Sequence, residues 1–269
     1  MAKGFGPDIV PDMLSIDMTM LDWGIFLVAG ITTGIINTLA GSGSLITLPI
    51  FVFVCGLPAP VANGTNRIGV LLQSGVGLAT YAKSGKETFD GSSWLVTPTV
   101  LGAIAGAFIA VELNEETMNL VLGGLMIFMF FVLLMKPSRW IHDMPVALHR
   151  NKQPLTIGAF FLIGVYGGFI QAGVGIFLLM GLVLISRYRL SSGNGIKLLI
   201  VFLYCIPSLA VFFWFDQVHI GYGLAMAVFQ AFGAWLAVRW VIHFKNADVW
   251  IHRLLIVIVA VAASKFLIW

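Results

Sequence analysis

The sequence has little charge. Only 10% of its 269 residues are Asp, Glu, Lys or Arg, whereas a soluble domain carries about 25%. Hydrophobic residues make up 59% of the chain, and apolar runs of ~20 residues recur along it, the length that crosses the ~30 Å hydrocarbon core of a bilayer. The shortage of charge therefore excludes a soluble domain and predicts a multi-pass helical protein of the inner or plasma membrane.

Other scarcities exclude further classes of protein. The net charge is only +3 and the bases are scattered, so no nucleic-acid surface is expected. The two cysteines, Cys55 and Cys205, form no metal-ligand pattern, and we expect no metal or other cofactor. No acid lies deep within an apolar run, and we find no nucleophile–base pair, so we expect a protein that is not an enzyme. The first 23 residues lack a basic stretch followed by an apolar core, so no cleavable signal is expected.

The apolar runs predict ten helical segments, two of them too short to span comfortably. The expected segments are 23–40, 44–55, 64–82, 93–111, 117–135, 155–173, 176–186, 195–213, 219–238 and 249–267. The short ones, 44–55 and 176–186, each follow a Gly-rich break, "LAGSGS" (39–44) and "QAGVG" (171–175). The sequence leaves open whether these two segments span the membrane or are re-entrant.

An internal repeat relates the two halves of the chain. "GITTGIINTLAGSG" (30–43) parallels "GVYGGFIQAGVG" (164–175), which pairs Asn37 with Gln171. "ANGTNRIGVLL" (62–72) parallels "SGNGIKLLIVF" (192–202), which pairs Arg67 with Lys197. We therefore predict an N-terminal tail (1–21), a first membrane repeat (22–135), a linker (136–153) and a second membrane repeat (154–269).

The loop charges predict that the repeats are inverted. Short cytoplasmic loops are enriched in Lys and Arg, so the basic 136–153 linker is placed in the cytoplasm. Counting helices from it puts Lys83 in the cytoplasm and Glu115, like the 1–21 tail, outside the cell. The expected fold is all-α, with two inverted-topology repeats of about five segments each and about 8–10 membrane segments in all.

Arg67 and Lys197 are the candidate binding residues, because a cation within a membrane segment indicates function. Each follows an Asn/Gly-rich turn, so we expect it in the first turn of a helix, where free N–H groups attract anions. The alternative is that both cations snorkel to the headgroups. Neutral donors to the same anion are expected from nearby polar residues: Asn63, Thr65, Asn66, Gln73, Asn194 and Tyr204. For Asn63 and Asn194 the alternative is helix capping, and for Tyr204 it is core packing.

The two breaks are the other candidate site. Unwound backbone is tolerated at membrane depth where it lines a cavity or is buried in protein, and secondary transporters place substrates at such breaks. The residues concerned are Asn37, Gly41, Ser42, Gly43, Ser44, Gln171, Gly173 and Gly175. The alternative role for small residues here is close helix packing.

The motifs "AGSGSLITLP…GLPAPVANGTNRIGVLLQS" and "GGFIQAGVG…GNGIKLLIV" resemble the TauE/SafE family, sulfite exporters also called toluene sulfonate uptake permeases. The resemblance implies a secondary transporter in the bilayer that exports small anions such as sulfite, sulfonates or sulfoacetate by alternating access. It also implies that Asn66, Arg67 and Lys197 bind the anionic head group. A passive anion channel is the alternative. The coupling ion (a proton or Na⁺) and assembly as a homo-oligomer stay open.

Overall fold

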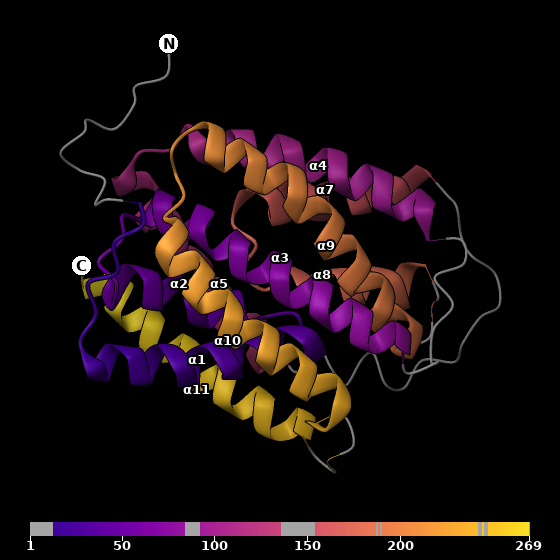
Figure 1. Cartoon of the computed structure of the whole chain (residues 1–269). Helices are drawn as coiled ribbons and strands as arrows, with labels where there is room; N and C mark the ends of the chain where they lie inside the picture. The colour runs from indigo at the N-terminus through magenta and orange to yellow at the C-terminus, as the bar shows by residue number, and fades with distance from the viewer. Residues whose placement is uncertain are drawn as a thin grey trace.

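The computed structural model describes residues 13–83, 92–135, 154–186, 188, 190–241, 244 and 247–268. Within these ranges the chain forms helices and no strands (Figure 1). The helices are α1 (Met20–Leu39), α2 (Ser44–Phe53), α3 (Ala59–Lys83), α4 (Ser93–Val111), α5 (Glu115–Leu134), α7 (Pro154–Phe169), α8 (Val174–Met180), η1 (Gly181–Ile185), α9 (Leu190–Trp214), α10 (Ile220–Arg239) and α11 (Ala247–Ile268). The all-α fold is confirmed, and every predicted helical segment is present.

Six described helices are long and apolar enough to cross a membrane: α1, α4, α5, α9, α10 and α11. Helix α3 has 25 residues, the same length as α9, but its polar stretch from Asn63 to Arg67 lowers its hydropathy. Large apolar side chains such as Leu101, Leu120 and Leu162 are exposed on the outside of the bundle, as expected where lipid is the solvent. The chain is a multi-pass membrane protein.

Two helices are interrupted where the sequence has its Gly-rich breaks. After α1, residues 40–43 are non-helical and Gly41 has a positive φ of 74°. After α7, residues 170–173 are non-helical, with Gln171 at φ 65° and Gly173 at φ 71°. The predicted breaks, 39–44 and 171–175, extend too far toward the C-terminus, because α2 begins at Ser44 and α8 begins at Val174 after its N-cap Gly173.

The helices that follow the breaks are too short to cross a bilayer. Helix α2 has 10 residues, about 15 Å at 1.5 Å per residue. It returns to the end of the molecule where α11 finishes, because the rings of Phe53 and Phe266 are 4.7 Å apart. In the second half, the seven residues of α8 continue into the π-helical η1.

Helices from the two halves pack against each other through glycines. Helix α1 packs on α10, and α7 packs on α4. A Cβ added to Gly34 of α1 would overlap the Gln230 carbonyl of α10, and one added to Gly168 of α7 would overlap the Ala103 carbonyl of α4. Helices α3 and α9 pack together between these pairs, α3 also contacting α10 and α9 also contacting α4. The core is therefore built jointly by both halves of the sequence.

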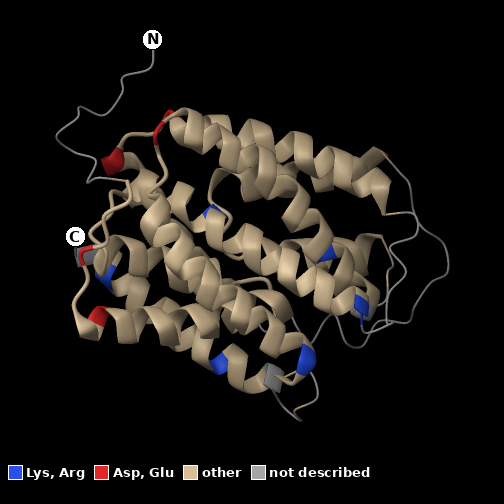
Figure 2. Ribbon diagram, viewed as in Figure 1, with Lys and Arg blue, Asp and Glu red and all other residues tan. Residues whose placement is uncertain are grey.

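The described acids gather at one end of the bundle, which they share with one base, Lys265 in the last turn of α11, while the other described bases lie further along it (Figure 2). The described acids, among them Glu115 and Asp216, lie at the end where α1 begins and α11 finishes. Lys83 and Arg239 end α3 and α10 at the opposite end. The positions of Lys83 and Glu115 at opposite ends of the bundle agree with the prediction that they face opposite sides of the membrane. The basic 136–153 linker, which was predicted to be cytoplasmic, lies outside the described residues.

Candidate functional site

The two helix breaks meet in the middle of the bundle. The Gly175 N–H donates a hydrogen bond of 2.9 Å to the Gly41 carbonyl. A Cβ added to either glycine would overlap the backbone of the other. Only glycine lets two backbones approach this closely. The first break therefore contacts the first turn of α8, just after the second break, through Gly41 and Gly175.

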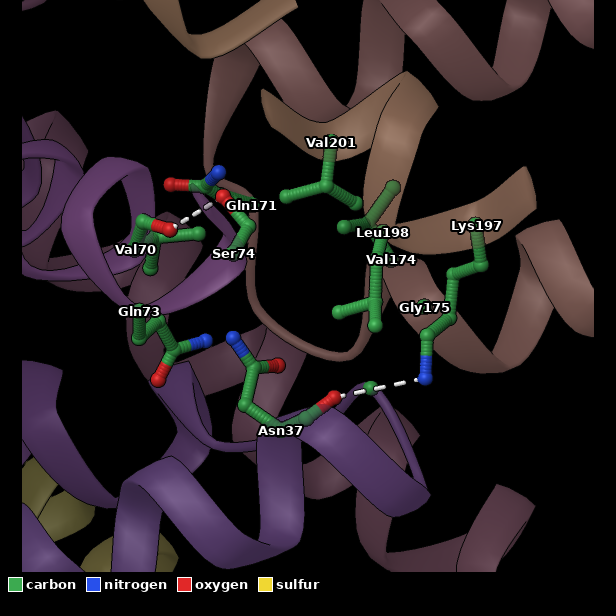
Figure 3. Close-up of a pocket in the computed structure, with 11 residues that line it drawn as sticks. Asn37, Val70, Gln73, Ser74, Gln171, Val174, Gly175, Lys197, Leu198 and Val201 are labelled. Carbon is green, nitrogen blue, oxygen red and sulfur yellow. Dashed lines mark hydrogen bonds between the residues drawn. The ribbon is translucent and has the colours of Figure 1, made fainter. Parts of the chain in front are cut away.

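A small cavity of about 10 Å³, room for about one water molecule, lies beside this contact. Its lining residues are Asn37, Gly41, Val70, Gln73, Ser74, Gln171, Val174, Gly175, Lys197, Leu198 and Val201. Figure 3 shows the side chains of Asn37 and Gln73 facing each other, while Val174, Leu198 and Val201 form an apolar wall. The lining contains one cation and no acid.

Lys197 contributes that cation and is only 1% exposed. Its Nζ donates to the Thr38 carbonyl at 2.7 Å, to Asn194 Oδ1 at 3.1 Å and to the Asn37 carbonyl at 3.4 Å. The two carbonyls belong to the last turn of α1, where C=O groups lack helical partners and the helix dipole is negative. The ammonium uses three neutral acceptors, so none of these bonds cancels its charge.

Arg67 is fully buried and caps the other interrupted helix. Its Nη2 donates to the Gly168 carbonyl at 2.5 Å and the Phe169 carbonyl at 3.4 Å, and its Nη1 donates to the Gly167 carbonyl at 3.3 Å. The guanidinium also lies 4.4 Å from the centroid of the Phe212 ring. These contacts enclose the guanidinium, and Arg67 does not line the cavity.

The predicted placement of both cations in a first helical turn is wrong. Helices α3 and α9 begin at Ala59 and Leu190, about five residues earlier than expected, so both cations lie two turns inside. Pro60 starts α3 early, since proline fits the first turn of a helix. The cations contact the C-terminal carbonyls of other helices rather than helix N-termini. Their burial also excludes snorkelling to the headgroups.

The polar residues around Arg67 hold the breaks in place. Asn66 donates from Nδ2 to Ser44 Oγ at 3.0 Å and accepts from Thr47 Oγ1 at 2.6 Å, which ties α3 to the start of α2. Asn63 donates to the Phe169 carbonyl at 2.7 Å, and Thr65 Oγ1 accepts the His219 N–H at 2.8 Å. Asn63 lies inside α3, as Asn194 lies inside α9, so neither residue caps a helix.

The remaining predicted residues stabilise the two turns. Gln171 donates from Nε2 to Tyr204 Oη at 3.1 Å and to Cys205 Sγ at 2.8 Å, while its Oε1 has no partner among the described residues. The Gly43 N–H donates to Asn37 Oδ1 at 3.2 Å, and Ser42 is buried next to it. Gly173 faces Met129 of α5. Of the predicted residues, the cavity brings together Asn37, Gly41, Gln73, Gln171, Gly175 and Lys197.

Two polar residues were missed by the sequence reasoning. Ser74 was not among the expected binding residues, but it lines the cavity. Gln230 of α10 was overlooked, although it is fully buried and neither amide atom has a partner among the described residues. Its amide lies against Gly69, whose added Cβ would be 2.5 Å from Gln230 Oε1. The sequence does mark Gln230, because it is a single polar residue within an apolar run, as Gln73 is.

The fold and the site define a class: a multi-pass helical membrane protein whose interrupted helices meet beside a buried, positively charged cavity. The chain belongs to the TauE/SafE family, because the family model described as "Sulfite exporter TauE/SafE" matches residues 26–266. It is therefore a membrane transporter of that family.

Two named relatives share nearly the full length of the chain. It is 27% identical over 239 residues to "Probable membrane transporter protein ORF9" of Sinorhizobium sp, which covers 88% of each chain. It is 21% identical over 244 residues to "Probable membrane transporter protein YfcA" of Escherichia coli K12, which covers 91% of this chain and 89% of the relative. No solved structure matches significantly.

Proposed function

We propose that this transporter exports a small sulfur-containing or organic anion, such as sulfite, a sulfonate or sulfoacetate, by alternating access. The anion binds between the two helix breaks, beside Lys197. The observation that carries the proposal is the cavity lining, which combines one buried ammonium with the amides of Asn37, Gln73 and Gln171, the Ser74 hydroxyl and no acid. Substrates of secondary transporters bind near the bilayer midplane at interrupted helices.

The electrostatics of Lys197 favour an anionic substrate. An ionised ammonium taken out of water needs compensation, and the carbonyls of Asn37 and Thr38 supply only partial negative charge. An oxyanion entering the cavity supplies a full negative charge. Lysine suits this exchange because its flexible stem lets the ammonium turn from the helix end toward a ligand.

The amides give the site its selectivity. Gln73 is buried, and its Oε1 has no partner among the described residues. An amide offers two N–H donors and can be turned so that they face the ligand. Neutral donors around one ammonium match the several oxygens of a sulfite, sulfonate or carboxylate, while the apolar wall of Val174, Leu198 and Val201 accommodates an organic remainder.

Inverted repeats provide the alternating access in this proposal. Three features support them. If each helix is replaced by its counterpart in the other half, the packed pair α1–α10 becomes α7–α4, and the packed pair α3–α10 becomes α9–α4. The two cations also cross over: Arg67 of the first half binds the end of α7, and Lys197 of the second half binds the end of α1. The interrupted helices meet at Gly41 and Gly175, where relative movement of the halves opens the cavity to one side or the other.

Transport assays in proteoliposomes test the substrate and the mechanism together. We expect saturable uptake of one anion from a panel of sulfite, a sulfonate, sulfoacetate and a simple carboxylate, with counterflow when the same anion is trapped inside. Lys197→Gln should abolish this uptake, whereas Lys83→Gln, at the exposed end of α3, should leave it unchanged. Linear, non-saturating flux without counterflow would instead indicate a passive anion channel.

Labelling experiments test the orientation of the repeats and the direction of transport. In a background without Cys55 and Cys205, a cysteine at position 115 should react with an impermeant reagent added outside the cell, and one at position 83 should not. The reverse pattern would overturn the assigned sides. Export predicts that energised inside-out vesicles accumulate the anion and that right-side-out vesicles lose it.

A further inference from the structure

A large apolar groove of about 960 Å³ lies on the outside of the bundle, between α1, α2 and α11. Its walls include Gly24 and Val28 of α1 and Val257 and Val261 of α11. Its floor is the short helix α2, including Pro49 and its neighbours. The groove is separate from the cavity beside Lys197, and no lining residue is common to the two.

The groove has the depth of one leaflet. On α1 it extends from Met20 to Thr32, and on α11 from Lys265 to Leu254. At 1.5 Å per residue these stretches are about 18 Å and about 16 Å long, close to half of the ~30 Å hydrocarbon core. It begins at the acidic end of the molecule, where α1 starts and α11 finishes, and it ends near mid-membrane. An acyl chain of the leaflet at that end fits this depth.

One cation stands at the mouth of the groove. Lys265 is the charged residue among those lining it, and it is exposed in the last turn of α11. Its Nζ lies 5.5 Å from the centroid of the Phe53 ring at the end of α2. The nearest acid of α1, Asp22, does not line the groove, and its carboxylate accepts hydrogen bonds from Thr19.

We infer that the groove binds an anionic phospholipid of that leaflet, with one acyl chain along α2 and the phosphate on Lys265. The apolar length and the single cation at the membrane surface match the two parts of such a lipid. The acyl chain would bury the outer side of α2, a helix of 10 residues that is too short to cross the whole bilayer. This site does not depend on which anion the protein transports.

Native mass spectrometry of the purified full-length protein with added phosphatidylglycerol or phosphatidylethanolamine tests the inference. We expect the protein to retain one phosphatidylglycerol more strongly than one phosphatidylethanolamine. Gly24→Leu should remove retention of both lipids, because the Gly24 Cβ position has nothing within 4 Å and opens into the groove. Lys265→Ala should keep lipid bound but reduce the preference for phosphatidylglycerol about fivefold, the effect of one surface cation on an anionic lipid.

Matched controls separate this site from general lipid contact. Gly124→Leu adds the same side chain at another exposed glycine with nothing within 4 Å, and Lys83→Ala removes a cation from the other end; neither should change retention. Equal retention by Gly24→Leu and the parent would overturn the proposal. A dimer that Gly24→Leu converts to a monomer, with no lipid lost, would overturn it in favour of a second copy of the chain.

Discussion

The two buried cations occupy aligned positions in the two halves, and each binds the carbonyls at the end of an interrupted helix, yet their surroundings differ. Arg67 binds the carbonyls at the end of α7, and Lys197 binds those at the end of α1. Arg67 is enclosed by three carbonyls and the Phe212 ring, whereas Lys197 borders the cavity between the breaks. Both cations bind the carbonyls at the end of an interrupted helix, but only Lys197 is placed where our proposal has the anion bind.

The choice of side chain fits this division. A guanidinium is a rigid fork whose donors are fixed in one plane, which suits the permanent neutralisation of the C=O groups of Gly167, Gly168 and Phe169. An ammonium is a compact charge on a flexible stem and can move between acceptors. The half with arginine is therefore expected to be the static one, and the half with lysine the one that responds to substrate.

Adding a side chain where Gly41 and Gly175 touch should have the largest effect. Gly175→Ala places a Cβ into the Gly41 backbone, and overpacking destabilises by about 1–3 kcal/mol, occasionally more. We expect loss of transport and a large fall in thermal stability, measured by uptake assays and by thermal denaturation in detergent. Gly158→Ala, where nothing lies within 4 Å, is the control. Normal transport by Gly175→Ala would show that the two breaks separate during the cycle without needing this contact.

Removing the static cation should affect stability more than binding. Arg67→Gln leaves carbonyls at the end of α7 without partners, so we expect a loss of about 2–4 kcal/mol in the free energy of unfolding. Arg67→Lys should restore part of it, since the charge is kept and the fork is lost. Thermal denaturation of the purified variants measures both. An Arg67→Gln variant as stable as the parent would contradict the capping role.

Adding negative charge to the cavity should weaken binding without removing a cation. Gln73→Glu places a carboxylate in the lining beside Lys197, and we expect at least a tenfold loss of anion affinity, about 1.4 kcal/mol. Gln73→Leu removes donors without adding charge, so its loss should be smaller. Titration calorimetry with the best-binding anion gives both values. Unchanged affinity in Gln73→Glu would place the anion elsewhere.

The smallest effect is expected at Gln171, whose backbone has a positive φ of 65°. Gln171→Gly and Gln171→Ala both remove the amide, so both should lose anion affinity a few-fold. Only glycine relieves the backbone strain, so Gln171→Gly should be more stable than Gln171→Ala by about 1 kcal/mol. The pair separates strain from binding, and equal stability of the two would show that the positive φ carries no strain.

The sequence alone predicted the helical segments and, to within about three residues, the positions of the breaks. These follow from local signals, namely apolar runs and glycines, and from the repeat that aligns Asn37 with Gln171. The sides of the membrane assigned to the loops at Lys83 and Glu115 also rest on charge and stay predictions. Local patterns are sufficient for such features because lipid demands long helices and tolerates breaks only inside the protein.

The contacts of the cations could not be predicted in the same way. The polar stretch Asn63–Arg67 resembles a turn when read locally, yet it lies inside α3 because its side chains bind partners far away in the chain. Arg67 and its Gly168 partner are 101 residues apart, and Lys197 and Thr38 are 159 residues apart. The carbonyls that attract these cations become available only when distant helices end beside them.

The central claim is that Lys197, and not Arg67, binds the transported anion. The most direct measurement is a calorimetric titration of Lys197→Gln and Arg67→Lys with the best-binding anion, beside the parent protein. The account predicts at least a tenfold loss of affinity in Lys197→Gln, within the ~1.5–3 kcal/mol of a charge-assisted hydrogen bond, and a change of less than about threefold in Arg67→Lys. Unchanged affinity in Lys197→Gln, with a large loss in Arg67→Lys, would contradict it.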